Sequence, residues 1–147
     1  MNDIGNKDTI TKLKTMFLGY PQTTLGIHEV LYIDTINGKA SAKYIAKNEM
    51  CHSGGIVQGG FVTGWIDAIM ALACMAKCGS DVLVLTLEIK INFLNSAKIG
   101  EIISTAKVIK NTKTIAFIEG KLEDNKGILI ATGTCTAKLK HNFYNDK

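Results

Sequence analysis

The sequence contains no arginine, and all 17 of its lysine and arginine residues are therefore lysine. Without guanidinium groups the chain lacks the commonest side chain for reading guanine edges and for gripping phosphates with two parallel hydrogen bonds. The net charge of +4 is spread along the chain without a long basic run. A solvated surface explains that charge as well as an anionic ligand does. We therefore expect no nucleic-acid partner.

Proline and regularly spaced cysteine are also scarce. The one proline is Pro21, and the four cysteines, at positions 51, 74, 78 and 135, do not have the spacing of a zinc motif or a disulfide framework. The first residues include acidic side chains and no uninterrupted apolar run, unlike a secretory signal or an Arg-rich transit peptide. We expect a cytoplasmic protein with reduced thiols, and neither a metal nor a cofactor.

The 147 residues, 46% of them hydrophobic and 20% charged, suit one soluble domain spanning positions 1–147. Helical spacing of Ile10, Leu13 and Phe17 predicts a short amphipathic helix over 7–18. Two extended runs between positions 25 and 46 flank Asn37-Gly38, the favoured dipeptide of a tight hairpin turn. These signals place a helix and a hairpin before the middle of the chain.

The second half of the chain has the period of β-strands. From Leu83 to Phe93 apolar residues alternate with Thr86, Glu88, Lys90 and Asn92, which predicts one face of each kind. Further strands are expected over 101–110, 114–123 and 128–139, separated by short polar turns. Because short connections favour antiparallel neighbours, the pattern predicts an α+β domain and not a doubly wound one.

Between the hairpin and the strands, positions 60–76 are hydrophobic on nearly every side of a helix. Such a helix is buried either in protein or in lipid. The stretch is short for a membrane span, and Asp67 at its centre would cost about 2.5–3.5 kcal/mol on insertion scales. We therefore expect no membrane partner and a helix wrapped by a curved sheet.

Asp67 is the one formally charged residue between Glu49 and Lys77. A carboxylate in apolar surroundings needs dedicated partners, which a catalytic site, a neighbouring strand or a partner subunit can supply. Glycines 54, 55, 59 and 60 precede the helix, and free amides at a helix start suit a developing oxyanion. Gly60 lies two turns before Asp67 on one face, which fits a hydrolytic site. A loop selected only for packing is the alternative.

Two motifs in the sequence resemble motifs of a known protein family. Gln58-Gly59-Gly60, followed by six residues and Asp67, resembles the HGG-x6-D signature of the phenylacetate-pathway-like (PaaI-type) hot-dog thioesterases. The run from Ile91 to Gly100 is similar to the strand and turn that follow in these enzymes. The resemblance covers about residues 24–139. It implies a hot-dog fold, in which a curved antiparallel sheet wraps a long central helix. It also implies homodimers or dimer-of-dimers tetramers with active sites between subunits.

The resemblance also assigns roles. It implies that Asp67 is a general base or nucleophile, and that the Gly59 N–H polarises a thioester carbonyl. Thr86 matches a Ser or Thr that reaches across the dimer to help position water. His52 stands where an asparagine is usual, and either holds the carbonyl or water or makes a structural bond in the loop. Gln58 replaces the usual histidine, and it can donate a hydrogen bond but cannot change charge near neutral pH.

The implied reaction is hydrolysis of an acyl-CoA to a free acid and CoA. Val57, Gly60 and Phe61 are expected to contact the substrate, and Lys107, Lys110 or Lys113 to meet the nucleotide phosphates. Two other functions stay open, a hot-dog hydratase or dehydratase of acyl thioesters and a non-catalytic acyl-CoA-binding domain. The residues after Lys140 are expected to form a frayed end.

Overall fold

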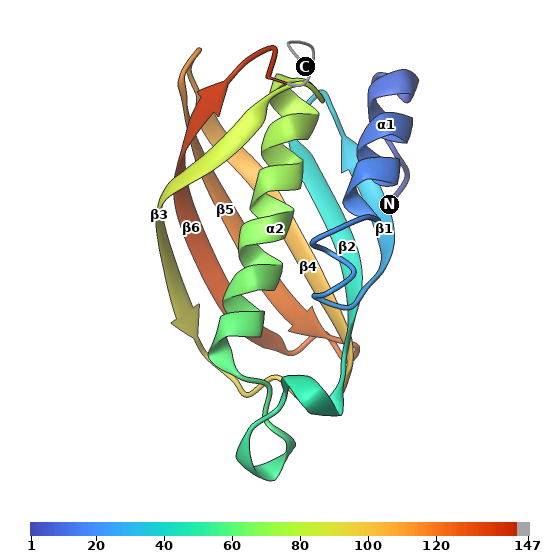
Figure 1. Cartoon of the computed structure of the whole chain (residues 1–147), viewed down its shortest axis with the longest axis vertical. Helices are drawn as coiled ribbons and strands as arrows, with labels where there is room; N and C mark the ends of the chain where they lie inside the picture. Colours follow the sequence, from blue (N-terminus) through green and yellow to red (C-terminus); the bar gives the residue numbers. More distant parts are fainter. Residues whose placement is uncertain (144–147) are drawn as a thin grey trace.

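In the computed structural model, which describes residues 1–143, one long helix lies against a six-stranded antiparallel sheet (Figure 1). Along the chain the elements are α1 (Lys7–Phe17), β1 (Ile27–Asp34), β2 (Lys39–Ala46), α2 (Gly59–Cys78), β3 (Leu83–Phe93), β4 (Gly100–Asn111), β5 (Ile115–Asp124) and β6 (Leu129–Lys140). This order confirms the predicted hot-dog fold, with boundaries within about two residues of the predicted ones. Part of the expected frayed tail, residues 144–147, lies outside the described residues.

The strand order β1-β2-β4-β5-β6-β3 differs from chain order in one respect that the sequence did not indicate. Residues 94–99 join β3 to β4, yet β5 and β6 lie between these two strands. Six extended residues reach about 20 Å, whereas three interstrand steps cover only about 14 Å. The expectation that a short connection joins sheet neighbours is therefore wrong at this turn. It leaves β3 as an edge strand.

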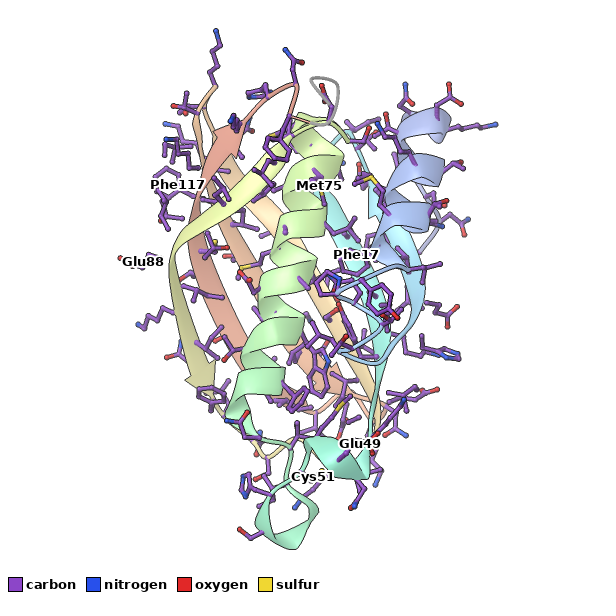
Figure 2. All side chains as sticks on the ribbon, viewed as in Figure 1. Phe17, Glu49, Cys51, Met75, Glu88 and Phe117 are labelled. Atoms are coloured by element: carbon purple, nitrogen blue, oxygen red, sulfur yellow. The ribbon has the colours of Figure 1, made fainter. Side chains whose placement is uncertain are left out.

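The predicted alternation along β3 is interrupted once, which corrects its expected faces. Thr86 pairs with Ala137 of β6, and Glu88 pairs with the adjacent Thr136, so Leu87 is an extra residue in the ladder. Such a β-bulge shifts the side-chain alternation by one position. Glu88 accordingly points away from α2 (Figure 2).

Because of the bulge, Thr86 lies on the same side of β3 as the apolar residues that pack against α2. The side chains turned toward α2 are Val84, Thr86, Ile89 and Ile91. Leu85 and Leu87, expected on the buried face, are instead 43% and 60% exposed. The sequence pattern alone put Thr86 on the opposite face of the strand from Ile89 and Ile91.

The central helix α2 is the core of the molecule, and the sheet curves around it (Figure 1). Small residues bring the two layers close together. A Cβ on Gly133 would lie 2.7 Å from Ile66 of α2, and one on Gly120 would lie 3.1 Å from Met70. By length and composition α2 is apolar enough to cross a membrane, a property that core helices share. Its packing against the sheet is that of a core helix.

Candidate active site

The start of α2 is capped by its own sequence. The carboxamide oxygen of Gln58, the N-cap residue, accepts a hydrogen bond of 2.6 Å from the backbone N–H of Gly60. The next amide, Phe61 N–H, donates to the Gln58 carbonyl at 3.0 Å. Because the first amides of a helix have no partner inside the helix, each must be satisfied separately. Gln58 satisfies two of them.

Gly59 N–H is left over. Among residues 1–143 it has no hydrogen-bond partner, although it lies at the positive end of the α2 dipole. The Gln58 carboxamide is held through its oxygen, and within residues 1–143 its N–H₂ group has no hydrogen-bond partner. One backbone donor and one side-chain donor therefore lie together at the helix start. This arrangement suits a carbonyl oxygen that gains negative charge.

Asp67 lies two turns further along α2 and meets the edge strand. The hydroxyl of Thr86 donates a hydrogen bond of 2.8 Å to Asp67 Oδ1. Both residues belong to one chain, and the role of Thr86 across a dimer, which the resemblance implies, stays a prediction. A threonine hydroxyl has one proton, and here that proton goes to the carboxylate. Asp67 Oδ2 and the remaining lone pair of Thr86 are free to accept hydrogen bonds from water.

A buried thiol lies beneath this pair. Cys135 of β6 is 6% exposed, and its Sγ is 3.9 Å from the Thr86 hydroxyl oxygen. Burial raises the pKa of the Cys135 thiol, and the nearby Asp67 carboxylate raises it further, against a lowering by the Thr86 hydroxyl. The thiol therefore stays protonated and can act as a weak donor to Thr86. Sequence analysis did not connect Cys135 with this site, because only the β3–β6 pairing brings them together.

The two halves of the site lie about two helical turns apart within a single chain. Eight residues separate Gly59 from Asp67, which corresponds to about 12 Å along a helix axis. An oxyanion donor must lie about 2.7–3.1 Å from its oxygen, and the attacking water must be similarly close to the carbon. The expectation of a hydrolytic site that uses this helix face stays a prediction.

A pocket of about 340 Å³ lies beside Gly59, between the loop before α2 and the connection from β3 to β4. His52 and Val57 line it, and a contact between Val57 and the substrate stays a prediction. His52 is exposed, and its Nδ1 is 3.3 Å from the Ser53 hydroxyl. Both the substrate-binding and the structural interpretation of His52 fit this geometry.

Other predicted contacts lie elsewhere. Gly60 and Phe61 do not line this pocket, since the Gly60 amide is bonded to Gln58 and Phe61 packs against the core. Lys107 lies on the sheet face opposite α2, where it pairs with Glu119 at 3.1 Å. There it borders a larger hollow of about 480 Å³ that contains neither Asp67 nor Gly59. A phosphate role for Lys107 at the Gly59 end is not supported by this position.

Within residues 1–143 no group of three or more His, Cys, Asp or Glu side chains is arranged to hold a metal ion. The four cysteines are free thiols, with Cys74 and Cys135 buried and Cys51 and Cys78 half-buried. Phe93, at the end of β3, contacts the Gly59 backbone and was not predicted as a site residue. Its place in the motif from Ile91 to Gly100 was the available signal.

Comparison with known proteins agrees with this geometry. The family model of the thioesterase superfamily matches residues 54–131, which include both Gly59 and Asp67. Human acyl-coenzyme A thioesterase 13 is 31% identical over 115 residues, covering 76% of this chain and 80% of the human protein. The mouse protein of the same name is 35% identical over 122 residues, covering 78% and 85%. The chain therefore belongs to the thioesterase superfamily, whose members hydrolyse thioesters.

Solved structures give the same result. Zebrafish thioesterase superfamily member 2 has a TM-score of 0.78 at 28% identity, with 90% of this chain and 99% of the fish chain covered. A phenylacetic acid degradation-related protein from Ralstonia eutropha JMP134 has a TM-score of 0.77 at 25% identity, covering 86% and 98%. These matches confirm the resemblance to the PaaI-type hot-dog family that the two sequence motifs indicated.

Proposed function

We propose that the protein hydrolyses acyl-CoA thioesters at sites shared between two copies of the chain. The observation that carries this proposal is the pair of incomplete half-sites. One end of α2 has a free amide without a base, and its middle has a carboxylate–hydroxyl pair without an oxyanion donor. Two antiparallel copies of α2 would bring Gly59 of one copy to Asp67 of the other. The names of the mammalian relatives support acyl-CoA as the substrate.

The edge strand β3 supports the pairing. Leu85, Leu87 and Phe93 are exposed by 43%, 60% and 58%, and no strand among residues 1–143 pairs with the free edge of β3. An open apolar edge strand is a template for pairing with another chain. Two β3 strands joined at this edge would continue the sheet across both copies and place the two α2 helices side by side. A dimer of such dimers remains compatible with this arrangement.

The chemistry follows from the hydrogen-bond inventory. The thioester carbonyl oxygen accepts hydrogen bonds from Gly59 N–H and from the Gln58 carboxamide of one copy. Water donates one hydrogen to Asp67 Oδ2 and the other to Thr86 Oγ1 of the second copy. Asp67 takes the first proton as water attacks the carbonyl carbon. The C–S bond then breaks, and CoA leaves as a thiolate that regains a proton. We assign the role of general base to Asp67 because Thr86 supplies the second acceptor for water.

Two inactivating substitutions test the shared site. Asp67→Asn keeps the side-chain shape and should lower turnover at least about a hundredfold, the lower range for loss of a general base. Gly59→Pro removes the amide donor at the first residue of a helix, a position that suits proline, although its Cβ requires the exposed Phe93 ring to shift slightly. Gln58 already has φ −64° and ψ 138°, the extended conformation that a following proline requires. Circular dichroism checks that both variants fold.

The decisive measurement mixes these variants by co-expression and follows release of the CoA thiol. Random pairing should restore about a quarter of wild-type activity, because half the dimers then contain one copy of each variant and one intact site. No recovery from a confirmed mixed dimer would show that the two residues do not act together across copies. Hydration of an enoyl-CoA without thiol release would indicate a hydratase instead. The cytoplasmic location inferred from the sequence stays a prediction.

A further inference from the structure

The pocket beside Gly59 is an open hollow lined by the loop before α2, the start of α2 and the connection after β3. Its deep wall is formed by the buried side chains of Val57, Val62 and Ala97, which are 3%, 3% and 2% exposed. Val57 N–H donates to the Ala97 carbonyl at 2.9 Å, which ties the loop before α2 to the connection after β3. The pocket is therefore built by two loops that hold each other in place, and it opens at the free amide of Gly59.

Phe93 forms the remaining wall. A Cβ placed on Gly59 would lie 3.3 Å and 3.4 Å from two atoms of the Phe93 ring, so the ring fills the space where another residue would have a side chain. The ring is nevertheless 58% exposed, and the adjacent Leu94 is 53% exposed. A large apolar surface thus stands next to the donor that the reaction needs.

Some polar groups around this pocket have partners within the chain, and the His52 ring and Ser96 also line it. The side-chain amide of Asn95 donates to the Leu129 carbonyl at 2.9 Å, and the backbone amides of Leu94 and Asn95 both donate to Ile130. A thioester carbonyl at Gly59 has two arms, the acyl group and the thiol arm of CoA. The thiol arm contains amide groups that need hydrogen-bond partners, whereas a hydrocarbon acyl group needs none. The pocket fits the acyl arm better.

We propose that this pocket receives the acyl group and that Phe93 limits its length. The inference rests on the proposed thioesterase function and deepens it. A volume of about 340 Å³ lies near the lower end of the range of about 300–1,000 Å³ for small-molecule pockets. The substrates are therefore short- and medium-chain acyl thioesters. The Phe93 ring, beside the carbonyl site, is the wall that a longer chain meets first.

The test compares butanoyl-CoA with dodecanoyl-CoA in the wild type and two variants. Phe93→Ala should raise the ratio of kcat/KM for dodecanoyl over butanoyl at least about tenfold, the lower range for a pocket change of one methylene or more. Phe93→Trp should lower the same ratio. Because both substrates are measured on one sample, the ratio does not depend on the fraction of active dimer. Size-exclusion chromatography records any effect of Phe93 on self-association.

Phe117→Ala is the matched control, since Phe117 of β5 is 45% exposed but does not line the pocket. In Figure 2 it lies toward the opposite end of the sheet from Cys51 and the start of α2. Its ratio should equal that of the wild type. An unchanged ratio in both Phe93 variants overturns the inference while leaving the proposed function intact. Wild-type enzyme that releases thiol from neither substrate overturns the proposed function itself.

A second pair of substrates separates the two arms. Butanoyl-N-acetylcysteamine has the same acyl group as butanoyl-CoA but a truncated thiol arm. Phe93→Ala should change the rates of both thioesters by the same factor. A change in the CoA preference, with the chain-length ratio unmoved, would place the thiol arm in the pocket and overturn the inference.

Discussion

The two edge strands of the sheet, β1 and β3, differ in whether the chain itself covers their free edge. At the β1 edge, Ile4 forms a parallel bridge with Asp34, through hydrogen bonds of 2.9 Å to the backbone of Ile33 and Thr35. Helix α1 covers this side of the molecule and buries Ile10, Leu13 and Phe17 (Figure 1). The chain thus supplies its own partner for the exposed backbone groups at the end of β1.

At the β3 edge no described residue plays that part. The strand is 11 residues long, and it is largely exposed along most of its length. The Asp67–Thr86 pair, the free Gly59 amide and the exposed Phe93 ring all lie on this side of α2. The candidate site residues therefore lie at the open edge of the sheet, whereas the chain itself covers the other edge. This division fits the proposal that a second copy completes the site.

The largest expected effect is on the closed side, at Trp65. Its side chain is fully buried, and its ring centroid lies 5.9 Å from that of Tyr44. The indole N–H donates a hydrogen bond of 2.7 Å to the Leu25 carbonyl, which connects the segment before β1 to α2. Trp65→Ala should lower the free energy of unfolding by about 3–5 kcal/mol, measured by urea denaturation. Trp65→Phe keeps a buried ring and should lose less. Equal losses in both variants would assign the effect to the hydrogen bond.

A smaller effect is expected at Asp34, which ends β1. It is 3% exposed, and its carboxylate accepts bonds of 2.8–2.9 Å from the Asn37 side chain and from the amides of Ile36 and Asn37. Burial raises the pKa of Asp34, but these bonds outweigh it, and the pKa is lowered. Asp34→Ala should cost about 1–3 kcal/mol at pH 7.

The pH dependence of this loss follows from the direction of the shift. A carboxyl group whose pKa is lowered in the folded state contributes fully to the stability of the fold above its ordinary pKa of about 3.9. That contribution is lost as the pH falls through the pKa of the folded state. The wild type should therefore approach the Asp34→Ala variant in stability at strongly acidic pH. Asp124→Ala, which removes similar bonds from the less buried turn after β5, should cost less at pH 7. A constant difference across pH would contradict the ionic contribution.

The smallest effect is on the open side, at Thr86. Thr86→Val keeps the shape and removes the hydroxyl that donates to Asp67. Turnover should fall about tenfold, because the attacking water loses its second hydrogen-bond acceptor, while thermal stability changes little, because water can replace the hydroxyl at the half-buried Asp67 carboxylate. Thr134→Val, at an exposed position facing away from α2, is the control and should keep full activity. A stability loss in Thr86→Val as large as that at Asp34 would contradict the contrast between the two edges.

Much of this arrangement could be predicted from local patterns. Some features depend only on residues that are neighbours in the sequence, so the sequence is enough to locate them. They are the hairpin at Asn37-Gly38, the apolar run of α2 and the turns between the last strands. Asp67 could be singled out because a charge in an apolar helix is visible without any tertiary contact. Gly59 followed from the position of glycines before a helix start.

The remainder depended on contacts between distant residues. The alternation of residues from Leu83 to Phe93 does not predict the bulge at Leu87, because a bulge depends on how two strands pair. That bulge turns Thr86 toward Asp67, and the β3–β6 pairing puts Cys135 beneath it. The same is true of Phe93 against Gly59, which are 34 positions apart in the sequence.

The sequence by itself determined the elements, the fold class and the residue types that chemistry needs, because secondary structure and helix capping are set within a few residues. Contacts across the fold set which strand is left at the edge, which way Thr86 faces, and that Phe93 lies close to Gly59. These are matters of distance across the fold. They become visible only when the sheet has closed around α2.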